Sequence, residues 1–156
     1  MRDVVILRDV VIDQSGTLWC GPCLVSAFAG APLTVAEEAL RKAGCGDFGA
    51  TTPEDVAAAF WAFGFGMRGV YAFAPGREPP LWRFLRMLDA RHHGEARLAI
   101  SIGPLSDLHW VATCGVIMPL ICDSMRRGRW VRFDEEGTDA DAPVGAAWIV
   151  ERRHGC

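Results

Sequence analysis

The sequence predicts an α+β domain in which an N-terminal helical lobe packs on an antiparallel β-sheet lobe. Helix caps and glycine stops recur through the first 91 residues, and short β-branched runs bounded by Gly, Pro or charge follow. Because these strands come after the helices and do not alternate with them, an antiparallel sheet is expected. A length of 156 residues and an apolar content of 51% suit one domain spanning residues 1–156.

Helix start and stop signals define the first two helices. A helix beginning at 17–19 should run through CGPCLVSAFAG and end at Gly30, which is followed by a proline. Thr34 and Glu37 have the spacing of a capping box, in which the threonine precedes the first helical residue. This pattern predicts a second, short helix that ends near Gly44.

A third helix, a strand and a fourth helix follow. Thr52 is a good N-cap, and Pro53 suits the first helical position, so a helix is expected through Phe63. Residues 67–73 (MRGVYAF) are expected to form a strand. Residues 80–91 have apolar side chains at the spacing of an amphipathic helix.

The remaining β-rich runs are read as strands. One is the N-terminal segment 4–12, expected at an edge, and the others lie in the second half of the chain. The later runs are ARLAISIG (96–103), LHWVATCGVI (108–117), LICDSM (120–125), RWVRFDEE (129–136) and AAWIVERR (146–153).

Composition and charge exclude some kinds of binding partner and predict the cellular compartment. A net charge of −3 gives no electrostatic footprint for binding nucleic acid or a membrane surface, so neither partner is expected. The charged N-terminus does not resemble a signal peptide, and no run has the roughly twenty apolar residues of a spanning helix. The six cysteines are therefore expected as free thiols in a cytoplasmic protein, or in an effector delivered without a recognisable signal.

The segment from Gln14 to Cys23 carries the strongest chemical signal, and it admits three readings. Trp-Cys-Gly-Pro-Cys is the thioredoxin active-site motif, but a thioredoxin fold requires a βαβ unit before it, and only one strand precedes it here. Cys20 and Cys23 can also form half of a zinc site, although no second CxxC or CxxH pair exists; the other half would come from Cys114, Cys122 or His109. Neither a metal nor an organic cofactor is expected.

The third reading is nucleophilic catalysis by Cys20. The N-terminal end of a helix stabilises a thiolate, and a histidine can form an ion pair with it. Gln14, six residues earlier, suits the role of an oxyanion donor. His109 and Asp123 lie on neighbouring predicted strands, so Asp123 can orient the imidazole as in a catalytic triad.

The order Gln14…Cys20-Gly-Pro…His109-Trp-Val…Asp123 resembles the papain-like cysteine peptidases, most closely the bacteriocin leader-peptidase domains that cut after double-glycine leaders. The resemblance spans most of the chain. It implies a papain-like fold with Cys20 as nucleophile, Gln14 as oxyanion donor, His109 as base and Asp123 as the orienting residue. Two positions depart from the family pattern: Trp19 stands where an acidic residue is usual, and Ser124 stands where proline is usual.

The function expected from these residues is a thiol peptidase, that is, hydrolysis of a peptide or amide bond in a peptide or protein substrate. The same triad can carry out acyl transfer or glutamine deamidation, as in papain-like effectors and toxins, and a relative with a decayed site can bind peptide without cutting it. Trp19 is a candidate for the substrate cleft, while Trp110 and Cys23 are expected in the core. The arginines of 126–132 are expected to form a solvated hairpin or a docking surface.

Overall fold

The structure is a computed structural model that describes residues 20–46, 48, 51–91, 97–103, 109–115, 120–123, 130–133 and 140–154. The predicted strand at 4–12, together with Gln14 and Trp19, lies outside the described residues. The elements are α1 (Cys20–Ala29), α2 (Leu33–Lys42), α3 (Pro53–Ala62), β1 (Phe65–Ala72), α4 (Leu81–Arg91), β2 (Arg97–Ile102), β3 (His109–Cys114), β4 (Leu120–Asp123), β5 (Trp130–Arg132) and β6 (Val144–Arg152).

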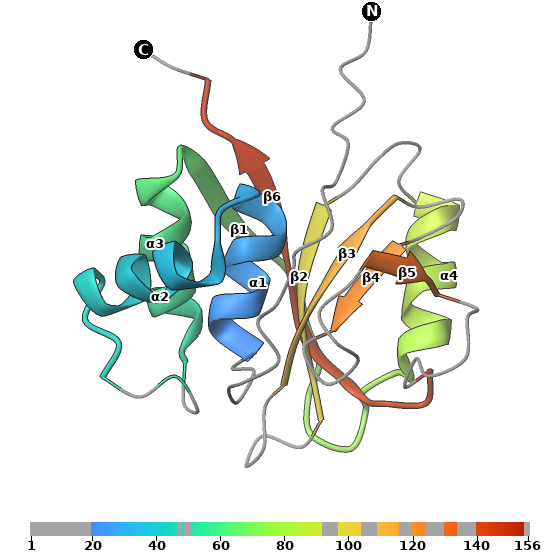
Figure 1. Cartoon of the computed structure of the whole chain (residues 1–156). Coiled ribbons are helices and arrows are strands. Elements are labelled where there is room, and N and C mark those ends of the chain that lie inside the picture. Colours follow the sequence, from blue (N-terminus) through green and yellow to red (C-terminus); the bar gives the residue numbers. More distant parts are fainter. Residues whose placement is uncertain are drawn as a thin grey trace, which may run out of the picture.

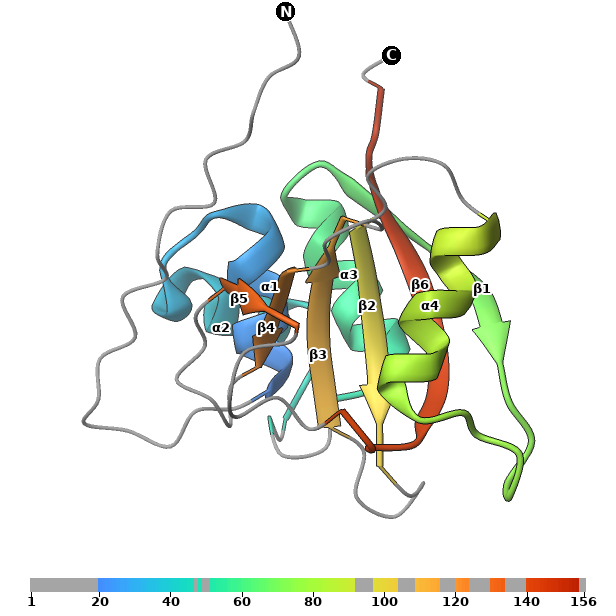
Figure 2. The same ribbon diagram turned by 90° about the vertical axis from the view of Figure 1, so that its right-hand side faces the viewer.

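The six described strands form one antiparallel sheet in the order β1-β6-β2-β3-β4-β5. Figures 1 and 2 show α1, α2 and α3 on one face of this sheet and α4 on the other. The predicted α+β class is therefore confirmed. Because every described pair of neighbouring strands is antiparallel, the parallel βαβ unit of a thioredoxin fold is not present in this part of the chain.

Helix α3 begins where the sequence predicts. The backbone N–H of Asp55 donates to Thr52 Oγ1 at 3.2 Å, and the Thr52 N–H donates to Asp55 Oδ2 at 3.1 Å, which completes a capping box. Pro53 occupies the first turn, where its missing N–H costs nothing. Gly64 follows the helix with a φ of +81°, a conformation that favours glycine.

Helix α2 begins earlier than predicted, so the capping box expected at Thr34 and Glu37 is wrong. The helix starts at Leu33, Pro32 takes the N-cap position, and no side chain caps it. The carbonyl of Pro32 accepts hydrogen bonds from the N–H groups of Val35 and Ala36, which places Thr34 inside the first turn. A residue inside the turn cannot act as the N-cap, because that role requires the non-helical position before it.

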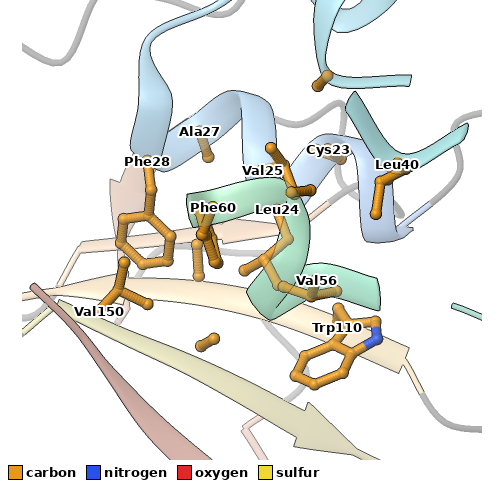
Figure 3. Packing of buried hydrophobic residues seen from close by; sticks show 14 of the residues in the cluster. Cys23, Leu24, Val25, Ala27, Phe28, Leu40, Val56, Phe60, Trp110 and Val150 are labelled. Carbon is orange, nitrogen blue, oxygen red and sulfur yellow. The ribbon is translucent and has the colours of Figure 1, made fainter. Parts of the chain in front are cut away.

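A separate hydrophobic cluster lies on each face of the sheet. On the α1 face, Leu24, Val56, Phe60 and Trp110 pack together in the cluster that Figure 3 shows. On the α4 face, residues of α4 pack with Ile100 and its neighbours. Strand β3 contributes to both clusters by alternation, with Trp110 and Ala112 on the α1 face and Val111 on the α4 face.

Helix α1 is buried around its whole circumference from Gly21 to Phe28. It has no charged residue in its first or last turn, and it packs on β3 and β4 of the sheet and against α2 and α3 (Figure 1). A helix that is apolar on every side belongs in a core. Only its first residue, Cys20, and its last, Ala29, are partly exposed.

Candidate active site

Cys20 is the first residue of α1 and is half-buried, whereas the eight residues after it are buried. The first N–H groups of a helix have no partner within the helix, and with the helix dipole they favour negative charge at this end. The fold therefore presents the Cys20 thiol at the partly exposed, electropositive end of an otherwise buried helix. This is a favourable place for a nucleophilic thiolate.

The beginning of α1 is attached to β3 through Thr51. Gly21 approaches Thr51 so closely that a Cβ placed on Gly21 would lie 2.5 Å from Thr51 Oγ1. The indole Nε1 of Trp110 donates a hydrogen bond to the Thr51 carbonyl at 3.1 Å. Since Gly21 follows Cys20 and Trp110 follows His109, these contacts bring the two candidate catalytic segments to one end of the molecule.

The figures agree with this placement. In Figure 2, β2 points toward the lower end of the molecule, and β3, its antiparallel neighbour, therefore begins there with His109. Figure 1 shows α1 rising from the same end, where its first turn carries Cys20. Alternation along β3 assigns Trp110 to the α1 face and His109, the first residue of the strand, to the opposite face.

His109 and Asp123 lie on paired strands, as predicted. Strands β3 and β4 are antiparallel, and Val111 is opposite Asp123. His109 is two residues before Val111, so His109 and Asp123 occupy diagonal positions in the register of the two strands. Diagonal positions in an antiparallel pair are roughly 7–8 Å apart at Cα, within reach of long side chains.

Cys23 and Cys122 lie in the core, and Cys114 is half-buried. Cys23, one turn after Cys20, is 2% exposed and belongs to the α1-face cluster, and Cys122 is 3% exposed in the same cluster. Cys114 ends β3 and is half-buried. Among the described residues, no three His, Cys, Asp or Glu side chains are arranged to hold a metal ion.

Ion pairs on the described surface join Arg68 to Glu151, across β1 and β6, and Lys42 to Glu38 within α2. Lys42 Nζ and Glu38 Oε1 are 2.8 Å apart on α2, and this hydrogen bond with the Lys42 charge lowers the pKa of Glu38. A shallow hollow of about 400 Å³ lies between α2 and α3, and its lining includes neither Cys20 nor His109.

In the described part of the chain, no single helix is long and apolar enough to cross a membrane. Only α1 and α2 taken together, with a bend of 111° between them, reach that length and composition.

Sequence reasoning did not find the contribution of Thr51 and Gly21. A glycine inside a helix costs about 1 kcal/mol relative to alanine, and this is a signal of a close contact when no turn requires the glycine. Gly21 lies within α1 at a position where the contact with Thr51 excludes any side chain. The partner was not predictable, because residue 51 is far along the chain.

Comparison with known proteins bears on the fold. No protein-family model matches the sequence, and no curated protein matches it significantly. Among solved structures, the peptidase domain of Streptococcus ComA, a bifunctional ABC transporter involved in quorum sensing, matches with a TM-score of 0.57 and 17% identity over 91% of this chain and 97% of that chain.

Two further structures agree. A double-glycine-motif protease from an AMS/PCAT transporter, solved in complex with the leader peptide, matches with a TM-score of 0.57 and 16% identity over 94% of this chain and 93% of that chain. The peptidase domain of Streptococcus mutans ComA matches with a TM-score of 0.52 and 18% identity over 91% of this chain and 98% of that chain. The chain therefore has the fold of these peptidase domains, which is the papain-like cysteine peptidase fold that its sequence resembles.

Proposed function

We propose that the chain is a cysteine peptidase in which Cys20 is the nucleophile, His109 the general base and Asp123 the residue that orients His109. The observation that carries the proposal is the position of Cys20 in this fold. It is the partly exposed first residue of a buried helix, and the Thr51 contacts hold that end of the helix beside the start of β3. The register of β3 and β4 supports the pairing of His109 with Asp123.

In the proposed reaction, His109 removes the proton from the Cys20 thiol, and the sulfur attacks the carbonyl carbon of the substrate. The developing oxyanion accepts hydrogen bonds from the Cys20 backbone N–H and the Gln14 side-chain amide. The tetrahedral intermediate collapses, the C–N bond breaks, and His109 protonates the leaving amine. Water, deprotonated by His109, then attacks the thioester, which releases the carboxylic acid and restores the thiol.

The proposed substrate is a peptide segment of a peptide or protein. One of the structures with the same fold is a complex with a leader peptide. A peptide substrate also suits this chain, because the Cys20 thiol is partly exposed at the end of a helix. Trp19, adjacent to Cys20 in the sequence, is proposed to contact that segment. An acyl transfer or a glutamine deamidation would use the same residues, because only the leaving group or the second nucleophile differs.

The reactivity of Cys20 can be tested without knowing the substrate. We expect iodoacetamide at neutral pH to label Cys20 fastest among the six thiols, and we expect His109→Ala to slow that labelling at least tenfold. Peptide mapping by mass spectrometry measures both rates, and Cys23→Ala is the matched control. A Cys20 that reacts no faster than the buried thiols, or that is indifferent to His109, contradicts the proposal.

The reaction class is tested separately with a peptide mixture. After incubation with the wild-type chain, new termini that disappear with Cys20→Ala support hydrolysis of peptide bonds. A mass gain of about one dalton at glutamine, with chains intact, indicates deamidation. Retained peptide affinity without any product in the wild type indicates a binding module, and a product that requires both Cys20 and Cys23 indicates thiol–disulfide exchange.

A further inference from the structure

We infer that Thr51 and Trp110 are positioning residues that set the location of Cys20 relative to the His109 strand; the inference rests on the proposed function. Neither residue belongs to the proposed triad. Both are buried, with Thr51 8% and Trp110 2% exposed, so neither is available to a substrate without rearrangement. Their effect on the reaction would be indirect, through the backbone that carries Cys20 and His109.

Two contacts of Thr51, one with Gly21 and one with Trp110, form what we call the clamp. The first of these contacts, with Gly21, is steric. The Gly21 backbone faces the Thr51 side chain so closely that a Cβ on Gly21 would lie 2.5 Å from Oγ1 and 2.7 Å from both Cβ and Cγ2. The Thr51 side chain is itself held, because Oγ1 donates to the Phe48 carbonyl at 2.9 Å. The sulfur of Cys45 lies 3.9 Å from the same oxygen. The first turn of α1 therefore rests against a fixed side chain.

The second contact is directional. Trp110 Nε1 donates to the Thr51 carbonyl at 3.1 Å, which joins β3 to the segment before α3. The Trp110 ring is held by the α1-face cluster, where it packs against Trp148 with ring centroids 5.1 Å apart. Figure 3 shows the ring directly below Val56 of α3.

These contacts form a short mechanical path between the two reacting groups. The path runs from Cys20 to Gly21 by a peptide bond, across the steric contact to Thr51, and across the hydrogen bond to Trp110, which is bonded to His109. The hydrophobic effect that buries α1 is not directional, so it does not by itself select one position of the helix along its axis. A displacement of about 1 Å is enough to cost roughly a hundredfold in rate, so a directional contact at this end matters.

The first test removes the hydrogen bond together with part of the Trp110 ring, and Trp148→Phe controls for the loss of ring volume in the same cluster. The measurement is the ratio of Cys20 alkylation rates by iodoacetamide at pH 6 and at pH 9, which reports pairing with His109 and is insensitive to simple changes in access. We expect Trp110→Phe to lower this ratio at least fivefold, toward the value of His109→Ala. Trp148→Phe, which removes the neighbouring indole of the same cluster, should change it less than twofold.

The second test uses rescue. Gly21→Ala introduces the Cβ that Thr51 excludes, and it should lower the same ratio at least fivefold. Thr51→Gly removes all three side-chain atoms that would clash, so the double variant Gly21→Ala/Thr51→Gly should recover most of the lost ratio. A general loss of stability would instead be worse in the double variant than in either single variant, and circular dichroism confirms that each variant is folded.

The outcomes separate this inference from the proposed function. If the wild-type ratio is already low and His109→Ala leaves it unchanged, Cys20 and His109 do not act together, and both proposals fail. If His109→Ala lowers the ratio but Trp110→Phe does not, and the double variant shows no recovery, the clamp alone is wrong and the proposed function stands.

Discussion

The face of the sheet covered by α1 and the face covered by α4 hold their helices in different ways. On the α4 face, one side of the helix is buried through Leu81, Phe84, Leu85 and Leu88, and exposed residues such as Arg83 lie on its other side. The rotation of such a helix about its axis is fixed by its own pattern, because any other rotation would expose the apolar side chains.

Helix α1 has no such pattern. Since it is buried on all sides, hydrophobicity alone does not select one rotation or one position along its axis. Specific contacts near its two ends fix the rotation of the helix and its position along its axis. Gly21 fits against Thr51 at the beginning, and Ser26 Oγ donates to the Ala31 carbonyl at 2.6 Å near the end. The helix that carries Cys20 is thus positioned by shape and hydrogen bonds, whereas α4 is positioned by burial.

The largest effect is expected for Cys20→Ala on the α1 face, which should abolish catalysis and leave stability almost unchanged. Cys20→Ala removes the proposed nucleophile, and we expect peptide hydrolysis to fall by at least about 10⁴-fold. The free energy of unfolding should change little, because the Cys20 side chain is small and half-buried. Product formation and urea denaturation measure the two quantities. Residual hydrolysis within tenfold of the wild type would exclude Cys20 as the nucleophile.

The second prediction concerns the α4 face. Phe84 is fully buried and makes edge-to-face contacts with Tyr71 and Phe73, at centroid distances of 5.3 and 5.9 Å. Phe84→Ala should destabilise the protein by about 3–5 kcal/mol, by lost burial and a cavity. Alkylation of Cys20 in the molecules that remain folded should stay within twofold of wild type, because α4 lies on the face of the sheet opposite α1.

The matched control for Phe84 is Phe60 on the α1 face, which is also fully buried and packs against Phe28 of α1 with centroids 5.8 Å apart. Phe60→Ala should cost a similar free energy of unfolding, about 3–5 kcal/mol, but should also slow Cys20 alkylation. Equal effects of the two substitutions on Cys20 would show that the two faces are not functionally distinct.

Local sequence signals predicted most of the elements, because the interactions that define element ends lie within a few residues. The capping box at Thr52 and the apolar spacing of 80–91 are examples. The capping box predicted at Thr34 is absent because another local signal, Pro32 with its fixed φ, takes the N-cap position. The place of an element in the sheet depends on residues that are far apart in the chain. Nothing in 67–73 indicates that β1 pairs with β6, or that α4 covers the face opposite α1.

The candidate site was predictable in part for the same reason. The spacing of His109 and Asp123 along the chain indicated two neighbouring strands, and the β3–β4 pairing agrees. The catalytic roles of these residues, and those of Gln14 and Trp19, stay predictions. The contact between Gly21 and Thr51 was beyond sequence reasoning, because a steric fit between residues this far apart leaves no periodic or compositional trace.

A smaller effect is expected at the cap of α3. Thr52→Ala removes the side-chain acceptor of the Asp55 N–H and should cost about 1 kcal/mol of unfolding free energy. Thr34→Ala is the control, because α2 has no side-chain cap and this threonine lies inside its first turn. We expect Thr34→Ala to change the urea midpoint much less. An equal loss for both threonines would mean that the capping assignment is wrong.

The smallest effect is expected at the exposed pair on α2. Lys42 lowers the pKa of Glu38 below its ordinary value through a hydrogen bond and its charge. A carboxyl with a lowered pKa in the folded state contributes stability at pH above its ordinary value, and loses it as the pH falls through the lowered pKa. Glu38→Gln should therefore lower the urea midpoint slightly at pH 7 and not at pH 2.

Salt should weaken this small difference at pH 7, because both side chains are exposed and the interaction is screened by ions. Alkylation of Cys20 should be identical in Glu38→Gln and wild type, since α2 meets α1 through its buried residues Ala36 and Leu40 and not through this pair. A Glu38→Gln variant with altered Cys20 reactivity would show that the exposed side of α2, like the buried helix beneath it, influences the position of the thiol.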